Sequence, residues 1–329
     1  MSKRYLVLAL VALVSFGLGF GLNELVRTKR SNHNAVGPVK VEKRQSGFKF
    51  INPILECQSL QNVEPPTIIK LKADLNALVD QVKKDGKATQ ISVYFRDLNN
   101  GPIIGIDQEA AYAPASLLKV PILIAVFKED ETNPGFLQKK FKYDHVTDPT
   151  MQANIVDSVS MKLGNSYSML DLVERMIIHS DNEAKGLIVE NIPEANLVQV
   201  HKELGIVVPG VRGVSDFMTV RDYSTFFRIL YNGTYLTHEH SELALEILSK
   251  TTFNKGIKAE IDDPLALVAH KFGERGLPEI NQMQLHDCGI VYCNGHTYLL
   301  SVMTKGKDFD QLAKVIAQIS KLVFDRVGR

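Results

Sequence analysis

Strand-like alternation of apolar and polar residues occurs in two separate parts of this chain, with a helical pattern between them, and this arrangement constrains the fold most. The strand-like segments are residues 90–97, 102–107, 266–272, 284–291 and 296–304. Asn99-Asn100-Gly101 and Asn294-Gly295 are hairpin-type turns between neighbouring segments. Strands at both ends around a helical middle predict one five-stranded antiparallel sheet, built from both ends of the chain, with helices packed against it.

Apolar residues recur at helical spacing over most of the remaining sequence from residue 67 onward. The first helix places Ile68, Leu71, Leu75, Leu78 and Val82 on one face. Further helices are expected at residues 115–128, 168–178, 181–190, 194–204, 219–231, 239–250 and 308–327. The expected fold class is therefore α/β of the α+β type, with flanking helices and an all-helical middle region.

The N-terminal part of the chain differs from the rest in composition. Residues 5–22 are uncharged and long enough to span a bilayer as a helix. The alternative is a cleaved signal peptide, whose apolar core would be shorter and would precede a small-residue cleavage site. The following polar and basic stretch ends in Pro65-Pro66, which is typical of a flexible tether. We expect a transmembrane anchor over residues 1–26, a tether over 27–66 and one folded domain over 67–329.

Charge and cysteine content narrow the classes of function. The formal net charge is +1 and no Lys or Arg cluster stands out beyond residue 45, so no nucleic-acid partner is expected. Three cysteines, Cys57, Cys288 and Cys293, are too few for a disulfide framework, and no spacing indicates a metal site. Cys288 and Cys293 are an odd number of positions apart on one expected strand. Their side chains should therefore face opposite sides of the sheet, without a bond between them.

Ser116-Leu117-Leu118-Lys119 opens one of the expected helices. The i to i+3 spacing puts the hydroxyl and the ammonium on one face, and unpaired N–H groups at a helix start can stabilise an oxyanion. The apolar neighbours of Lys119 should lower its pKa and make the amine a base for the serine. The alternative is an ordinary helix-start serine beside a snorkelling lysine. The spacing is common, because Ser46 and Lys49 repeat it in the expected tether.

Two further short motifs follow along the chain. Ser180-Asp181-Asn182 precedes an expected helix, and there Ser180 can relay a proton to a leaving nitrogen while Asn182 holds a substrate amide. The structural alternative is a capping box formed by Ser180 and Glu183. Lys271-Phe272-Gly273 ends an expected strand, where a glycine lets a substrate backbone approach and the ammonium faces an anion. Its alternative is any strand that ends in a turn.

Taken in order, the three motifs resemble those of the class A β-lactamases and penicillin-binding proteins, and the resemblance covers about residues 67–329. The resemblance implies that Ser116 is the acylated nucleophile and that Lys119 is its base or relay. It also implies that Ser180 is the proton shuttle and that Asn182 contacts the substrate.

The same resemblance assigns the other side of the site to the third motif. It implies that Lys271, beside Gly273, binds the substrate carboxylate, and that the backbone N–H groups of Ser116 and Glu274 form the oxyanion hole. The implied substrate is a β-lactam or a peptidoglycan stem peptide, and no cofactor is implied. The expected location is the cell membrane, as a single-pass protein with its catalytic domain on the extracytoplasmic side.

Two features depart from that family. Phe272 stands where the family has Thr or Ser, so a hydroxyl donor to the substrate carboxylate is missing, at a cost of about 1 kcal/mol or more. The loop that should carry a deacylating glutamate, residues 205–218, has only one carboxylate, Asp216. Asp216 is as readily a cap for the helix near Thr219 as a base. Acylation is therefore expected, and fast deacylation is not.

The favoured interpretation is a class A β-lactamase-like serine hydrolase that β-lactams acylate at Ser116 and that deacylates slowly. One alternative is a D-alanyl-D-alanine carboxypeptidase-like penicillin-binding protein. Another is a catalytically silent cell-wall-binding module, which Phe272 and the missing glutamate favour. The Ser116–Lys119 pair and Ser180-Asp181-Asn182 favour an enzyme.

Overall fold

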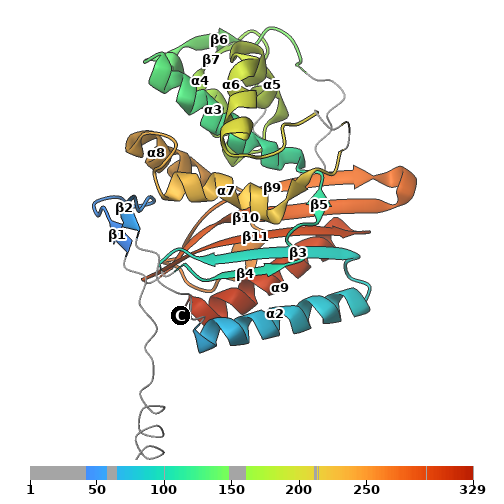
Figure 1. Ribbon diagram of the computed structural model, residues 1–329. Helices are drawn as coiled ribbons and strands as arrows, with labels where there is room; N and C mark the ends of the chain where they lie inside the picture. The colour runs from blue at the N-terminus through green and yellow to red at the C-terminus, as the bar shows by residue number, and fades with distance from the viewer. Residues whose placement is uncertain are drawn as a thin grey trace, which may run out of the picture. The chain divides into compact units, whose positions relative to one another are not determined.

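A five-stranded antiparallel sheet in the order β4-β3-β11-β10-β9 forms the centre of the computed structural model (Figure 1). Its strands are β3 (Gln90–Asp97), β4 (Ile103–Ile106), β9 (Leu267–Leu277), β10 (Gln282–Cys293) and β11 (His296–Gly306). β3 pairs with β11, with Val93 opposite Val302, so early and late parts of the chain meet inside one sheet. This confirms the fold that the alternating segments predict, and it leaves β9 as an edge strand.

The structure describes most of the chain beyond residue 41. The described residues are 42–57, 65–99, 101–147, 161–210, 213, 215–293 and 295–328, and they belong to a single structural unit. The expected anchor over residues 1–26 and parts of the expected tether lie outside them. Within these ranges no helix is both long and apolar enough to cross a membrane.

Helices cover both faces of the sheet (Figure 1). α2 (Pro66–Lys84) and α9 (Phe309–Val327) pack on one face through a shared apolar core. On the other face, α7 (Val220–Tyr231) and α8 (His238–Ser249) pack on the sheet. Beyond them lie α3 (Lys119–Thr132), α4 (Met169–Ile178), α5 (Asn182–Asn191) and α6 (Glu194–Glu203) (Figure 1). Each expected helix is present. The buried stripe of α2 differs at one position, because Val79 rather than Leu78 completes it.

The two cysteines of β10 show that the alternation along this strand was predicted correctly. Cys288 is buried in the core beneath the helical middle region, and Cys293 is buried in the core beneath α2 and α9. Both are free thiols. Side chains an odd number of positions apart point to opposite faces of a sheet, which is why the two sulfurs cannot meet.

Residues 42–57 differ from the expected tether, because they are folded against the domain. β1 (Glu42–Arg44) and β2 (Ile54–Cys57) form a two-stranded ribbon. Between them, the backbone N–H groups of residues 49–51 donate to the carboxylate of Glu242 on α8. Two apolar side chains of this connecting segment are buried in the core. Composition did not reveal this, because the partners of the segment, such as Glu242 and Tyr292, lie far along the chain.

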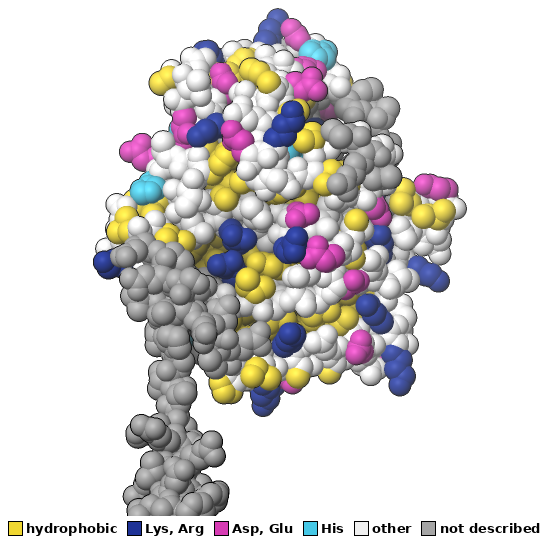
Figure 2. Space-filling view, viewed as in Figure 1, with side chains coloured by type: hydrophobic (Ala, Val, Ile, Leu, Met, Phe, Trp, Pro, Cys, Tyr) yellow, Lys and Arg dark blue, Asp and Glu magenta, His cyan; other side chains and the backbone are white. Residues whose placement is uncertain are grey.

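Two more ribbons connect parts of the helical middle region. β5 (Ala111–Tyr112) pairs with β8 (Met218–Thr219), and β6 (Lys140–Lys142) pairs with β7 (Ser166–Ser168). The first ribbon links the segment before Ser116 to the start of α7. On the face drawn in Figure 2, Lys and Arg side chains of the described residues are interspersed with Asp and Glu.

Candidate active site

Ser116 lies in a short 3-10 turn, η1 (Ala115–Leu118), that leads directly into α3. The N–H of Leu117 closes the turn by donating to the carbonyl oxygen of Pro114 at 2.9 Å. Ala115 has a φ of 48°, in the left-handed region that residues other than glycine rarely adopt. Such strained positions concentrate at functional sites. The turn leaves Ser116 partly exposed in the wall of a pocket.

Gly273 lets the edge strand β9 run directly against this turn. A Cβ atom at Gly273 would lie 2.7 Å from the carbonyl oxygen of Pro114 and 3.1 Å from the backbone nitrogen of Leu117. The first distance is too short for any side chain and the second is tight, and both neighbours are backbone atoms. Gly273 therefore allows the serine-bearing turn to lie against β9, and the approach of a substrate backbone at this glycine stays a prediction.

Lys119 is buried and is held by the segment that carries the second motif. Its Nζ donates to the carbonyl oxygen of Ser180 at 2.5 Å, to Ser180 Oγ at 3.0 Å and to Asn182 Oδ1 at 2.8 Å. An ammonium has three hydrogens, and all three acceptors belong to residues 180–182. Burial, followed by the positive charges of Lys271 and Lys185, lowers the pKa of Lys119 well below its usual value. A neutral amine can exchange one of these bonds for a lone pair directed at Ser116.

Ser180 connects two buried lysines. Its Oγ accepts hydrogen bonds from Lys119 and from Lys271, each at 3.0 Å. The capping-box interpretation of Ser180 is wrong, because Asp181 is the N-cap of α5 and accepts from the backbone N–H of Glu183 at 2.8 Å. Ser180 itself has a φ of 55°, which places it outside the helix. Its hydroxyl is thereby available to the site.

Lys271 supports Ser180 from behind and is not part of the pocket wall. It is fully buried, and it donates to Ser180 Oγ at 3.0 Å and to the carbonyl oxygen of Phe272 at 3.2 Å. Its Nζ also lies 4.0 Å from the centre of the Phe272 ring. Burial lowers the pKa of Lys271 to about 7. Binding of a substrate carboxylate by Lys271 stays a prediction, and in this structure the ammonium is held by Ser180 and the Phe272 carbonyl oxygen.

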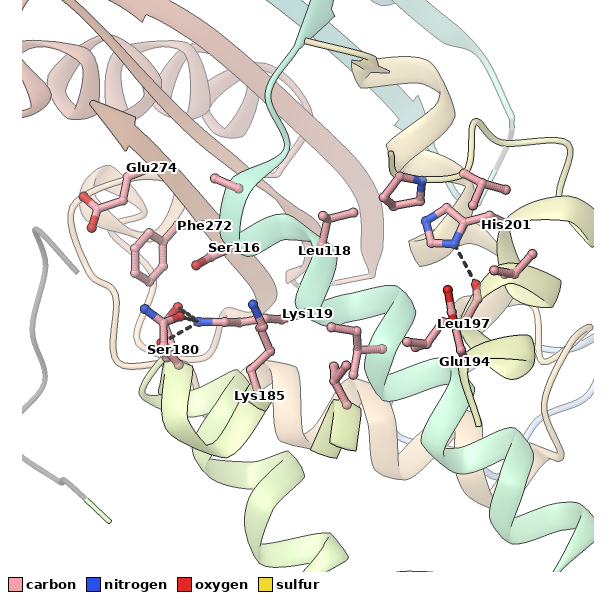
Figure 3. A pocket seen from close by; sticks show the side chains of 17 residues that line it. Ser116, Leu118, Lys119, Ser180, Lys185, Glu194, Leu197, His201, Phe272 and Glu274 are labelled. Carbon is pink, nitrogen blue, oxygen red and sulfur yellow. Dashed lines mark hydrogen bonds between the residues drawn. The ribbon is translucent and has the colours of Figure 1, made fainter. Parts of the chain in front are cut away.

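Phe272 fills the position where the family has a hydroxyl. Its ring stacks on Phe253 with centroids 4.2 Å apart, and it lines the pocket beside Ser116 and Glu274. Figure 3 shows Ser116, Ser180, Phe272 and Glu274 grouped on one side of this pocket. We call this side, together with Lys119 and Asn182, the reactive end.

The pocket has a volume of about 500 Å³ and continues from the reactive end to α6. Glu194, Leu197, Val198 and His201 line it at i, i+3, i+4 and i+7 spacing, so a single face of α6 forms this wall. Val208 and Pro209 complete it, and we call this side the apolar end. Sequence reasoning missed these residues, although their helical spacing was visible.

Lys185 is a second residue that sequence reasoning missed. It lines the pocket from α5, one turn after Asn182, and Figure 3 shows its side chain beside that of Lys119. The helical i to i+3 spacing from Asn182 was the signal that could have indicated it.

Asp216 has neither of the roles that the sequence suggested. The N-cap of α7 is Thr219, whose hydroxyl accepts from the N–H of Asp222. Asp216 instead pairs with Lys305 at 2.7 Å and accepts from Gln284 at 3.1 Å, and it does not line the pocket. Burial tends to raise the pKa of Asp216, but these hydrogen bonds outweigh it and lower the pKa of this carboxyl below its usual value. Both partners come from distant strands, which the local sequence could not show.

The sequence and the fold of this chain are similar to those of known proteins. A family model described as "Beta-lactamase enzyme family" matches residues 70–327. No curated protein matches the sequence significantly. A PBP-A variant in an acyl-enzyme complex with penicillin G is 23% identical, with a TM-score of 0.64, over 80% of this chain and 98% of that chain.

Two β-lactamase structures give similar values. The β-lactamase from Chitinophaga pinensis is 19% identical, with a TM-score of 0.67, over 77% of this chain and 98% of that chain. The TLA-1 extended-spectrum β-lactamase is 18% identical, with a TM-score of 0.66, over 78% of this chain and 98% of that chain. At these identities the likeness shows a shared fold.

Proposed function

The chain belongs to the β-lactamase enzyme family and is a serine hydrolase of that type, and we propose that β-lactams acylate it at Ser116 and are released slowly. One observation carries the proposal. Lys119, Ser180 and Asn182 form a continuous hydrogen-bond network in the pocket wall that also holds Ser116. An acyl-enzyme of PBP-A with penicillin G, on the same fold, supports it.

The network supplies the proton transfers that acylation needs. Ser116 Oγ attacks the lactam carbonyl while its proton passes to neutral Lys119, whose pKa burial has lowered. The lactam nitrogen leaves with a proton from the Ser180 hydroxyl. The two lysines that donate to Ser180 Oγ can then return a proton to it. The products are an ester at Ser116 and a free ring amine.

The developing oxyanion belongs between the turn and the edge strand. The backbone N–H groups of Ser116 and Glu274 are the proposed donors, and Gly273 allows η1 and β9 to lie close together. Such donors lower the barrier most when they are fixed before the reaction. The packing of backbone against backbone at Gly273 provides this rigidity.

Slow release follows from the carboxylates near the site. Asp216 is engaged with Lys305 away from the pocket. Glu194 lines the apolar end of the pocket, on the side opposite to Ser116 in Figure 3, and the proposal uses Glu274, at the reactive end, through its backbone N–H. General base catalysis of ester hydrolysis contributes roughly 10²–10⁴ in rate, so an acyl-enzyme without a placed base accumulates.

Intact-mass measurement after incubation with a penicillin tests the nucleophile. The protein should gain one drug mass, and Ser116→Ala should gain none. Ser46→Ala is the matched control, because Ser46 begins the other Ser-x-x-Lys sequence, and it should label normally. Adduct formation in Ser116→Ala would show that the nucleophile is a different residue. An unlabelled wild-type protein would instead favour a silent binding module.

Turnover of a chromogenic cephalosporin tests slow release. We expect a burst equal to the enzyme concentration, followed by a steady state far slower than the burst. Rapid steady turnover without a burst would require a deacylating base that the described residues do not place beside Ser116.

A further inference from the structure

The apolar end of the pocket offers space beyond the reacting atoms. Leu197 and Val198 of α6 line it together with Val208 and Pro209, and the whole pocket is of the size that holds a small-molecule ligand. In Figure 3, Leu197 and His201 lie on the side opposite to Ser180 and Glu274. A group bound there would be a distant part of a molecule whose reactive carbonyl lies at Ser116.

His201 is a buried polar side chain at this apolar end. His201 is only 4% exposed, and its Nδ1 lies 2.9 Å from the carbonyl oxygen of Leu197. A carbonyl oxygen only accepts, so Nδ1 carries the hydrogen. The ring packs edge-on against Phe226, with centroids 5.6 Å apart, which fixes its orientation.

The second ring nitrogen of His201 lacks a partner. Nε2 is buried, and no hydrogen bond reaches it from any residue that the structure describes. Burial lowers the pKa of His201, so the ring is neutral near neutral pH and Nε2 presents a lone pair. In Figure 3 this nitrogen faces away from Leu197, toward Leu118 across the pocket. A buried acceptor without a donor is unfavourable, and a ligand hydroxyl or N–H would satisfy it.

We propose that the apolar end is a subsite for an apolar acyl side chain that carries a hydroxyl or N–H donor, with His201 Nε2 as the acceptor. The subsite rests on the proposed function, because its ligand is the molecule that acylates Ser116. A phenol has the required chemistry: its ring packs on Leu197 and Val198, and its hydroxyl donates to Nε2. A purely apolar ring fills the same space but leaves the acceptor unsatisfied.

Ampicillin and amoxicillin test the subsite, because they differ only by a para-hydroxyl on the side-chain ring. Dissociation constants are measured by calorimetry with Ser116→Ala, in which no acyl-enzyme can form at that residue. Amoxicillin should bind about fivefold to tenfold more tightly than ampicillin, which is the effect expected of one net hydrogen bond. Adding His201→Phe keeps an aromatic ring and removes Nε2, so the two affinities should become equal.

Control variants separate His201 from its surroundings. His201→Gln retains a polar side chain and should keep part of the preference, while melting temperatures verify that each variant folds. Lys202→Ala, on the exposed next residue of α6, should keep all of it. Loss of the preference in Glu194→Gln rather than in His201→Phe would overturn the proposal, because Glu194 also lines the pocket.

The outcomes also separate this proposal from the proposed function. Equal affinities in Ser116→Ala, or no binding of either penicillin, would overturn the subsite even if the wild-type protein is labelled covalently. A hydroxyl preference without covalent labelling would support the subsite and overturn the proposed acylation.

Discussion

The two ends of the pocket are built in different ways. At the reactive end, direct hydrogen bonds join Lys119, Ser180 and Asn182, and each member is held by at least one other. At the apolar end, one face of α6 supplies side chains whose positions the helix sets, and the hydrogen bond of His201 to the Leu197 carbonyl oxygen lies within that helix. Substitutions at the reactive end should therefore change the rate for every acyl donor. Substitutions at the apolar end should change which acyl donor is preferred.

Charge distinguishes the two ends as well. The reactive end contains Lys119 and Lys185 in its wall and Lys271 directly behind it. The apolar end contains the neutral imidazole of His201 among aliphatic side chains, with Glu194 as the one acidic residue that α6 adds to this wall. The lysines that transfer protons in the proposed acylation all lie at the reactive end, so the pH dependence of acylation should report the lysines of that end.

Replacing Lys119 should have the largest effect of all the substitutions considered, and the effect should be confined to the reactive end. Lys119→Ala should slow acylation by at least ~100-fold for ampicillin and amoxicillin alike, because it removes the base and leaves Ser180 with one lysine partner. Stopped-flow measurement of the acylation rate constant checks this, and the melting temperature reports on the fold.

Lys128→Ala is the matched control for Lys119, since Lys128 lies on the same helix, pairs with Glu131 and is not in the pocket wall. It should leave the acylation rate within about twofold of wild type. A small effect of Lys119→Ala on the rate would mean that this lysine only supports the structure.

Most of the fold was predictable because its signals are local. The alternation over residues 90–97 and the spacing of Ile68, Leu71 and Leu75 each need only a short window. Residues 42–57 were not predictable in this way. Their attachment depends on Glu242, whose carboxylate accepts from three successive backbone N–H groups, and no pattern in a tether-like sequence indicates a partner on α8.

Gly273→Ala should impair the reactive end by displacing its residues while leaving each of their side chains in place. The added Cβ would meet the carbonyl oxygen of Pro114 at 2.7 Å, so β9 and the Ser116 turn must separate. We expect an acylation rate about tenfold lower, since a displaced reacting group is poorly aligned, and a loss of about 1–3 kcal/mol in unfolding free energy.

Gly276 is the control for Gly273 on the same strand. A Cβ there would lie 3.4 Å from the sulfur of Met283, an ordinary contact, so Gly276→Ala should acylate normally. Unchanged acylation in Gly273→Ala would show that the serine-bearing turn does not depend on β9.

The candidate site was predictable to the extent that its motifs are contiguous in sequence. Ser116, Lys119 and Ser180 were indicated by short patterns, and the fold brings them together. Neighbouring cap formers made Ser180 ambiguous, because Asp181 is an equally good N-cap and occupies the capping position. The burial of Lys271 was not visible, since the expected strand ended at residue 272, whereas β9 continues to Leu277 and Lys271 lies in its middle, covered by Phe272 and the Ser180 segment.

Lys185→Ala should have the smallest effect on the acylation rate, and it tests how the charges at the reactive end set the pKa of Lys119. The positive charge of Lys185 disfavours the protonated form of Lys119 and so contributes to its lowered pKa. Removing that charge should raise the pKa of Lys119, so less neutral amine is present at a given pH. The acid limb of the pH–rate profile for acylation should therefore move to higher pH. The acylation rate at neutral pH should fall by less than about tenfold, because a partly exposed charge is screened.

The direction of this shift also decides which lysine controls the acid limb. The lowered pKa of Lys271 comes from burial, and Lys185 is not among its causes. A limb that belongs to Lys271 would stay in place in Lys185→Ala, whereas a limb that belongs to Lys119 must move. Lys185→Arg keeps the charge and should keep the limb, and high salt should shift the wild-type limb in the same direction as Lys185→Ala. Rate–pH profiles for ampicillin and amoxicillin should shift equally, since the charge acts at the reactive end. A shift for amoxicillin alone would mean that Lys185 acts through the apolar end instead.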